Sequence, residues 1–241
     1  MRAVILAGGK GTRLRPFTAT LPKPLVPVGD RSILDIVLMQ LKQAGVTRVT
    51  MAVNHLAHLI QAYFGDGSKW GLAIDYSLED RPLSTIAPLT LIDDLPERFF
   101  VMNGDVLADL DFRDLYHTHE RTDADITVAT FERDARIDFG VLHTDDEGRV
   151  VGFEEKPSYH FSVSMGVYVM SRRLLDVVPR GEPFGFDDLM HTCVAEGRPA
   201  ITYPHRGYWL DIGRPDDYAE ANETIDAWML RLFPDGDPSA P

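Results

Sequence analysis

Apolar runs and helical repeats alternate along the first hundred residues of the chain. Residues 2–7 form a short run of Val, Ile, Leu and Ala before two glycines, which is typical of a buried parallel strand. Apolar residues then repeat at helical spacing between positions 33 and 44, where Ser32 can cap the helix and Gly45 can end it. Further along, the pattern predicts strands at 48–53, 72–77 and 99–102, a helix at 55–64, and a weaker helix near 85–92.

This alternation predicts an α/β fold with a doubly wound, mostly parallel sheet and right-handed crossovers. Ligands in such sheets bind beyond the carboxyl ends of the strands. Residues 8–13 and 103–105 each follow a predicted buried strand, so both segments are expected at that edge.

The later part of the chain has a more mixed pattern. It predicts strands at 126–131, 139–143, 150–154 and 163–170, a hairpin turn at 146–148, and helices at 186–196 and 215–232. No linker separates two units, so residues 1–233 are expected to form a single domain. The tail at 234–241 is rich in Pro, Gly, Asp and Ser and is expected to fray.

Composition narrows the class of protein. The 241 residues are 44% hydrophobic, enough for one α/β domain with a sizeable core, and the net charge of −13 disfavours binding to nucleic acid or anionic membranes. Cys193 is the single cysteine, and no apolar run is long enough for a signal peptide or a membrane span, so a cytoplasmic location is expected.

The loop after the first strand concentrates positive charge in this acidic chain. It reads Gly8-Gly9-Lys10-Gly11-Thr12-Arg13, and no Asp or Glu occurs before Lys23, which stands between two prolines. Glycines let backbone amides approach phosphate oxygens, while Arg and Lys neutralise their charge. The string matches neither a Walker loop nor a dinucleotide fingerprint, because Gly11 and Leu14 stand where those motifs need Ser or Thr and Gly.

The longer string Leu6-Ala7-Gly8-Gly9-x-Gly11-Thr12-Arg13-Leu14, followed by Pro22-Lys23-Pro24, resembles the signature of the sugar-1-phosphate nucleotidyltransferases. That family includes mannose-1-phosphate guanylyltransferases and glucose-1-phosphate thymidylyltransferases. The resemblance implies a three-layer fold with a Rossmann-like nucleotide half and a mixed-strand sugar-phosphate half. It implies catalytic roles for Arg13 and Lys23, and nucleotide-binding roles for Leu6, Ala7, Gly8, Gly9, Gly11 and Thr12.

Two acidic positions are candidates for a metal site. Asp105 follows a buried strand and a glycine, and Asp211 lies in a second short apolar run that ends in glycine. Taken alone, each is more often a turn or cap residue. The resemblance implies that both hold Mg²⁺, which prefers a few carboxylates together with phosphate oxygens. Asp109 and Asp111 are weaker candidates, and Asp111 can instead cap a helix near Phe112.

Further matches to the family pattern imply the sugar-phosphate side. By resemblance, Lys156 grips the phosphate, Glu154 or Glu155 binds sugar hydroxyls and Gly140 offers backbone contacts. Gly166 belongs to the same side, but Ser164 stands where many relatives have Asn. Because Ser offers fewer hydrogen bonds than Asn, an unusual sugar or a cyclitol phosphate stays open beside glucose and mannose.

The nucleotide base is expected near Glu79, Ser84 and Thr85. Relatives often have glycine where Ser84 stands. A carboxylate at Glu79 suits the two adjacent donors of guanine better than the edge of thymine or uracil, which favours GTP, with dTTP or UTP as the alternative. Glu79 as a solvated loop residue is nearly as good an interpretation.

The expected reaction joins an NTP to a sugar 1-phosphate and releases pyrophosphate by direct displacement. The phosphate nucleophile is already ionised at pH 7, so no general base is needed and the protein positions and neutralises its substrates. Two alternatives stay open: a non-catalytic nucleotide or sugar-phosphate sensor on the same fold, and transfer to an acceptor of another kind. Since relatives are often dimers or tetramers, a homo-oligomer is also compatible with the sequence.

Overall fold

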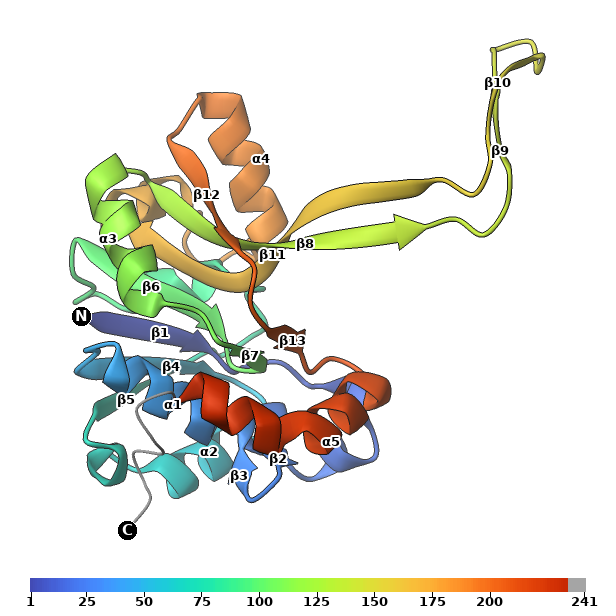
Figure 1. The fold of residues 1–241 in the computed structure, drawn as a ribbon. Coiled ribbons are helices and arrows are strands. Elements are labelled where there is room, and N and C mark those ends of the chain that lie inside the picture. Colours follow the sequence, from blue (N-terminus) through green and yellow to red (C-terminus); the bar gives the residue numbers. More distant parts are fainter. Residues whose placement is uncertain (234–241) are drawn as a thin grey trace.

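The computed structural model describes residues 1–233, so the expected fraying of 234–241 lies outside the described residues. Its main strands are β1 (Arg2–Leu6), β4 (Arg48–Val53), β5 (Ala73–Leu78), β6 (Arg98–Asn103), β8 (Ile126–Arg136), β11 (Ser158–Ser171) and β12 (Ala200–His205). They form one seven-stranded sheet in the order β12-β8-β11-β6-β1-β4-β5, shown in Figure 1. Within this sheet β11 runs antiparallel to both neighbours, and the other pairs that join β1, β4, β5, β6, β8 and β12 are parallel. The predicted doubly wound, mostly parallel fold is confirmed.

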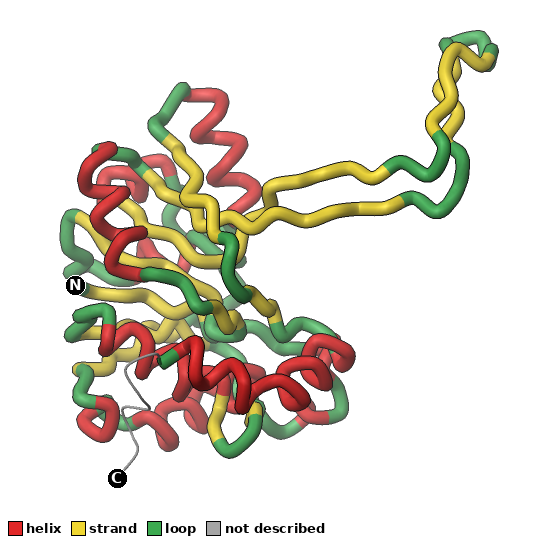
Figure 2. The backbone as a smooth tube through the Cα atoms, in the orientation of Figure 1, coloured by secondary structure: helices red, strands yellow, loops and turns green. Residues whose placement is uncertain are grey.

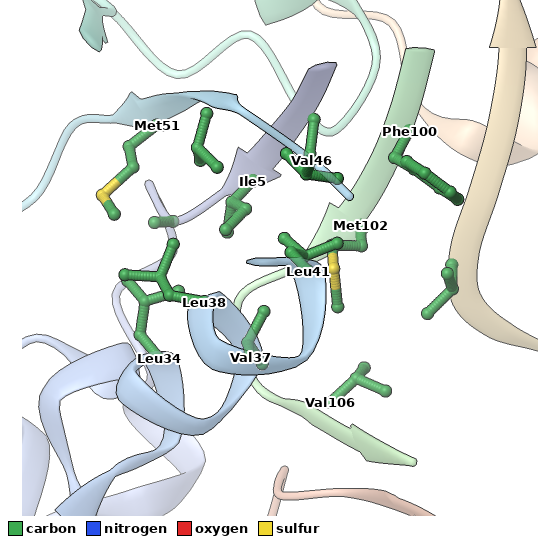
Figure 3. Packing of buried hydrophobic residues seen from close by; sticks show 14 of the residues in the cluster. Ile5, Leu34, Val37, Leu38, Leu41, Val46, Met51, Phe100, Met102 and Val106 are labelled. Carbon is green, nitrogen blue, oxygen red and sulfur yellow. The ribbon is translucent and has the colours of Figure 1, made fainter. Parts of the chain in front are cut away.

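Helices cover both faces of the sheet. One face packs against α1 (Ile33–Gln43), α2 (Ala57–Phe64) and α3 (Phe112–Thr122), and Figure 3 shows Leu34, Leu38 and Leu41 of α1 beside Ile5 and Met102 of the sheet. The opposite face packs against α4 (Phe186–Glu196) and the short 3₁₀ helix η5 (Ala87–Leu91). A last helix, α5 (Pro215–Leu232), packs on a third cluster with residues of α1 and of the loop after β1. The result is the expected three-layer α/β/α arrangement.

Local signals explain why the helices begin where they do. The Ser32 hydroxyl accepts a hydrogen bond from the Asp35 amide at 3.1 Å, and the Ser32 amide donates to the Asp35 carboxylate at 3.1 Å, so the predicted cap is a full capping box. Asp111 caps α3 through the Asp114 amide at 2.9 Å, as its alternative interpretation had it.

Several elements differ from the prediction. The expected weak helix at 85–92 is instead the short 3₁₀ helix η5, in which Pro88 offers no amide hydrogen. The strands predicted at 126–131 and 163–170 are longer, as β8 and β11. Three features were not predicted from the sequence: β12, β7 (Val106–Ala108) and the small hairpin of β2 (Pro27–Val28) and β3 (Arg31–Ser32).

A long two-stranded arm projects from this body. We define the arm as residues 132–163, which comprise the outer halves of β8 and β11 and, between them, the hairpin of β9 (Val141–Thr144) and β10 (Val150–Glu154). Figures 1 and 2 show it leaving the sheet as a pair of strands with no helix along it. The predicted hairpin turn is confirmed: the Asp145 amide donates to the Arg149 carbonyl and the Gly148 amide donates to the Asp145 carbonyl, both at 3.0 Å.

Within residues 1–233, no helix combines the length and the apolar character needed to cross a membrane.

Candidate active site

The two candidate metal carboxylates meet through a pair of very short strands. β7 follows β6 directly and pairs antiparallel with β13 (Trp209–Asp211), in a register that puts Val106 opposite Asp211. The Ile212 amide donates to the Asp105 carbonyl at 3.1 Å and closes this pairing. Two aspartates that are far apart in the sequence are therefore held side by side at the carboxyl end of β6.

Both predicted catalytic cations lie beside these aspartates. The buried Lys23 forms an ion pair with Asp105, and its Nζ lies 3.9 Å from Asp211 Oδ1. Lys23 begins the 3₁₀ helix η3 (Lys23–Leu25). Pro22 and Pro24, on either side of Lys23, restrict the backbone of this turn. Arg13 reaches the loop after β13, since a methyl group built on Gly213 would lie 3.6 Å from an Arg13 guanidinium nitrogen.

Gly11 shapes the loop that carries these cations. Its φ of 59° lies in the left-handed region, and an added Cβ would lie 2.9 Å from a Thr18 methyl carbon and 3.1 Å from the Lys23 Cβ. Only glycine fits such a conformation and such close neighbours without strain. Thr18 in turn donates from Oγ1 to the Gly11 carbonyl at 2.7 Å, which ties the loop to itself.

The carboxylates have unused capacity for a cation. Asp105 Oδ1 and Asp211 Oδ1 are buried and have no hydrogen-bond partner among the described residues. Burial and the neighbouring charge of Asp105 raise the pKa of the Asp211 carboxyl, although Lys23 and Arg13 oppose this rise. Residues 1–233 hold no cluster of three or more metal-ligating side chains. Two carboxylates with open oxygens therefore fit Mg²⁺, which takes its remaining ligands from phosphates and water.

A cavity of about 570 Å³ opens next to this cluster, at the point where the strand order reverses between β1 and β6. That volume lies within the range of small-molecule sites. Among the predicted nucleotide residues and the metal pair, those that line it are Leu6, Gly8, Gly9, Glu79, Ser84, Thr85 and Asp105. The remaining lining residues are Lys10, Ala52, Asn54, Pro82, Pro88 and Asn103.

Some predicted nucleotide residues do not line the cavity. Ala7 is buried, and its amide donates to the Ala52 carbonyl at 2.8 Å. Gly11 and Thr12 lie at the start of the 3₁₀ helix η1 (Thr12–Leu14). Asn54 lines the cavity without having been predicted, and its Nδ2 donates to the Glu79 carbonyl at 3.2 Å. Asn54 comes directly after β4, so the strand-end rule contained a signal for it.

Glu79 faces the cavity but also supports its wall. Its Oε2 accepts a hydrogen bond from the Leu83 amide at 3.1 Å, and burial raises the pKa of its carboxyl despite that bond. The other oxygen, Oε1, would lie 3.0 Å from a Cβ added to Gly8, so the first glycine of the loop makes room for this carboxylate.

Ser84 has a φ of 68°, a left-handed backbone conformation that glycine adopts more readily than serine. The next residue, Thr85, accepts from the Phe186 amide at 2.9 Å and so satisfies the start of α4. Both residues thus shape the wall of the cavity through the backbone that they fix.

The predicted sugar-phosphate residues divide between two places. Gly166 lies in the body against Asn103, whose Nδ2 would be 2.6 Å from an added Cβ. Ser164 donates to the Tyr168 hydroxyl at 3.2 Å and accepts from the Gly166 amide at 3.3 Å, so its hydroxyl is occupied within β11. Gly140, Glu154, Glu155 and Lys156 all lie on the arm, and the structure does not bring them to the cavity of the same chain.

The weaker metal candidates have structural partners. Asp109 Oδ1 accepts from the Tyr208 amide at 2.5 Å and lies 2.9 Å from His205 Nε2, and Asp111 caps α3. Neither is available to the carboxylate pair at Asp105.

A doubly wound sheet whose reversal point combines a glycine-rich basic loop with paired aspartates is typical of α/β proteins that bind nucleotides. The profile of the family described as Nucleotidyl transferase matches residues 2–227, and the chain belongs to that family.

Three relatives illustrate this membership. The chain is 33% identical to the UTP–glucose-1-phosphate uridylyltransferase of Synechocystis, over 92% of this chain and 62% of that protein. It is 34% identical to the mannose-1-phosphate guanylyltransferase of Mycobacterium tuberculosis, over 92% of this chain and 64% of the relative. The crystal structure of HddC from Yersinia pseudotuberculosis complexed with GMP-PN aligns with a TM-score of 0.72 at 25% identity, covering 93% of this chain and 99% of that one. The chain thus spans less than two thirds of these curated relatives but nearly all of HddC.

Proposed function

We propose that this protein transfers a nucleoside monophosphate from an NTP to a sugar 1-phosphate or a similar phosphate, and that GTP is the preferred donor. The observation that carries the proposal is the convergence of Arg13 and Lys23 with Asp105 and Asp211 at the mouth of the cavity. Relatives named as uridylyl- and guanylyltransferases of sugar 1-phosphates support the same reaction class.

The chemistry is a displacement at the α-phosphorus of the NTP. An oxygen of the sugar phosphate forms the new P–O bond, the bond to the β-phosphate breaks, and pyrophosphate leaves. Arg13 is assigned to the α-phosphate and the leaving group, and Lys23 to the phosphates beside it, since both cations stand at the carboxylate pair. The amides of the loop at Gly8 and Gly9 line the cavity and suit phosphate oxygens.

Mg²⁺ is the proposed cofactor, held by Asp105 and Asp211 through their open oxygens. When bound, it would neutralise phosphate charge. Removal of divalent ions with EDTA is expected to abolish turnover, and added Mg²⁺ to restore it. Turnover that persists in EDTA would remove the metal from the scheme.

Base preference is assigned to Glu79. Its carboxylate lines the cavity and suits the donor edge of guanine, and several relatives are named as guanylyltransferases. We expect Glu79→Gln to reduce the ratio of GTP to UTP turnover about tenfold or more, as the loss of one paired contact does. Asp80→Asn is the matched control, because Asp80 is the exposed neighbouring carboxylate. Equal effects of both substitutions would show that Glu79 does not select the base.

The acceptor is a hexose 1-phosphate or a related phosphate. Because the Ser164 hydroxyl is satisfied within its own strand, it does not replace the Asn of relatives as a sugar contact, and unusual acceptors remain part of the proposal. The experiment is an array of GTP, dTTP, UTP, CTP and ATP crossed with sugar 1-phosphates, measured by pyrophosphate release. Binding of nucleotide without pyrophosphate release in any combination would favour the sensor.

A further inference from the structure

The arm carries apolar surface that residues 1–233 leave exposed. β9 and β10 pair only with each other in the described sheets. A two-stranded hairpin is marginally stable in water, and contiguous exposed apolar side chains mark an interaction surface. Of the thirteen large apolar side chains exposed among residues 1–233, seven lie on the arm: Ile137, Phe139, Leu142, Val150, Val151, Phe153 and Phe161.

The end of the arm nevertheless has an organised polar group. A Cβ added to Gly140 would lie 2.6 Å from a ring carbon of Phe153, so the glycine lets the two strands close at this point. His143 Nε2 lies 2.8 Å from Glu154 Oε1, and the Tyr159 hydroxyl donates to Glu154 Oε2 at 3.4 Å. The Glu154 carboxylate is thus held by two polar contacts on the surface of the arm, two positions before Lys156 in the sequence.

The cavity of the same chain is out of reach of this group. The pairing of β8 with β11 continues outward from Phe131↔Val163 to Arg136↔Ser158 without interruption, and it directs the hairpin away from the body, as Figure 1 shows. Folding the hairpin back would break this ladder of hydrogen bonds. A single chain therefore holds a phosphate cavity without Lys156, and it holds Lys156 without a cavity.

We propose that two copies of this chain exchange arms, so that Glu154, Glu155 and Lys156 of one copy complete the sugar-phosphate side of the cavity in the other. This inference rests on the proposed function for the role of these residues. A two-fold pair places each arm on the other body, completes two cavities at once, and covers both apolar hairpins. A second copy of this chain is the partner that fits the arm, because every copy carries both a cavity that lacks Lys156 and an arm that offers Lys156.

Complementation between two inactive variants tests the exchange. Arg13→Ala removes a cation of the body, and Lys156→Ala removes the cation of the arm. Co-expressed with different tags and purified through both, they form a pair in which one cavity has intact Arg13 and receives an intact arm, while the other lacks both. We expect about half of the wild-type activity from such a two-fold pair. An inactive mixed pair, or a failure of the two tags to co-purify, would overturn the proposal.

A matched control separates the arm from subunit mixing in general. Arg13→Ala paired with Asp211→Asn has intact arms but one defect in each cavity, so this mixed pair is expected to stay inactive. Activity in this control pair would show that recovery does not come from arm exchange, and would contradict the proposal.

A second readout does not depend on turnover. Phe153→p-benzoylphenylalanine, introduced in a mixture of isotopically light and heavy chains, is expected to give mixed light–heavy cross-links to peptides around the partner cavity on irradiation. Cross-links confined to one chain would overturn the exchange. If the wild type instead releases no pyrophosphate in the full array while these interchain cross-links form, the proposed function fails and the exchanged arm stands.

Discussion

The body and the arm are stabilised in opposite ways, although one chain builds both. In the body Phe100 is fully buried between sheet and helices, whereas Phe153 on the arm leaves 60% of its surface exposed. Helices cover both faces of the sheet, but the arm consists of paired strands alone. The body thus contains both a hydrophobic core and the cavity within one chain. The arm has no core of its own, although residues proposed to bind the sugar phosphate lie on it.

The largest effect is expected from a substitution in the body that lowers turnover and leaves the fold intact. Arg13→Ala removes the cation beside Asp211 and Gly213, and we expect turnover to fall about a hundredfold or more, as with other transition-state contacts. Steady-state pyrophosphate release measures the turnover, and circular dichroism measures whether the fold is retained. Arg15→Ala removes an exposed charge from the same loop and is the control, with an effect expected within a few fold. Wild-type turnover in Arg13→Ala would refute its role.

The second largest effect is expected in the free energy of unfolding, which should fall for a substitution in the body and not for one on the arm. Phe100→Ala leaves a void in the largest core cluster and is expected to lower the free energy of unfolding by about 3–5 kcal/mol. Phe153→Ala removes an exposed ring, and we expect the urea midpoint of the body to stay near wild type while the oligomeric mass decreases. Urea unfolding and sedimentation measure the two outcomes. Similar losses of unfolding free energy in both variants would show that the arm belongs to the core.

A buried histidine makes the stability of the body dependent on pH. His119 is fully buried against Thr127 and Ser171, and burial lowers the pKa of its imidazole to about 4 from 6.5. Folding therefore favours the neutral imidazole. The contribution of His119 to the free energy of unfolding is complete above pH 6.5, and about 3 kcal/mol of it is lost as the pH falls to about 4.

Urea unfolding at pH 7 and pH 4.5 measures this difference. His119→Gln keeps polar atoms near both hydroxyls but does not titrate, so the difference between the two pH values should shrink. His191→Gln, at an exposed position of α4, is the control and should leave the difference as in the wild type. An unchanged difference in His119→Gln would assign the pH dependence to other groups.

The smallest expected effect concerns the backbone of the cavity wall. Ser84 holds a left-handed φ of 68°, which costs a non-glycine residue about 1–2 kcal/mol in the folded state. Glycine avoids this cost but gives the unfolded chain more conformational entropy, which lowers the free energy of unfolding by roughly 0.5–1 kcal/mol. Ser84→Gly should therefore raise the free energy of unfolding by about 0.5 kcal/mol, measured as a shift of the urea midpoint. A clear loss of stability would indicate that the Ser84 hydroxyl makes a contact of its own.

Local patterns predicted the body better than the arm. The capping box at Ser32, the buried run of β1 and the helical repeat of α4 are local signals, and the structure has these elements close to the predicted bounds. The length of β8 and β11 was underestimated, because beyond Phe131 the strands are exposed and their sequence lacks the apolar run that marks a buried strand.

The site shows the same division. The glycine-rich loop, Lys23 and the two aspartates were named from motifs, and pairing of β7 with β13 brings the aspartates together. The position of Gly140 and Lys156 away from that cavity was not predictable from the motif, because a motif identifies residues by type and spacing and contains no information on how far the strands that carry them extend. Asn54 was missed for a simpler reason: a single polar residue after a strand has no motif to mark it.

The three-residue strand β13 has a consequence for the growing polypeptide. Asp211 reaches Asp105 through the pairing of β13 with β7, so a nascent chain that ends before Asp211 would contain the glycine-rich loop and the cavity walls but only Asp105 of the carboxylate pair. Such fragments could retain the nucleotide-facing half and still be unable to turn over substrate. In chain order the carboxylate pair is therefore completed after β12, the last strand of the seven-stranded sheet, has been synthesised.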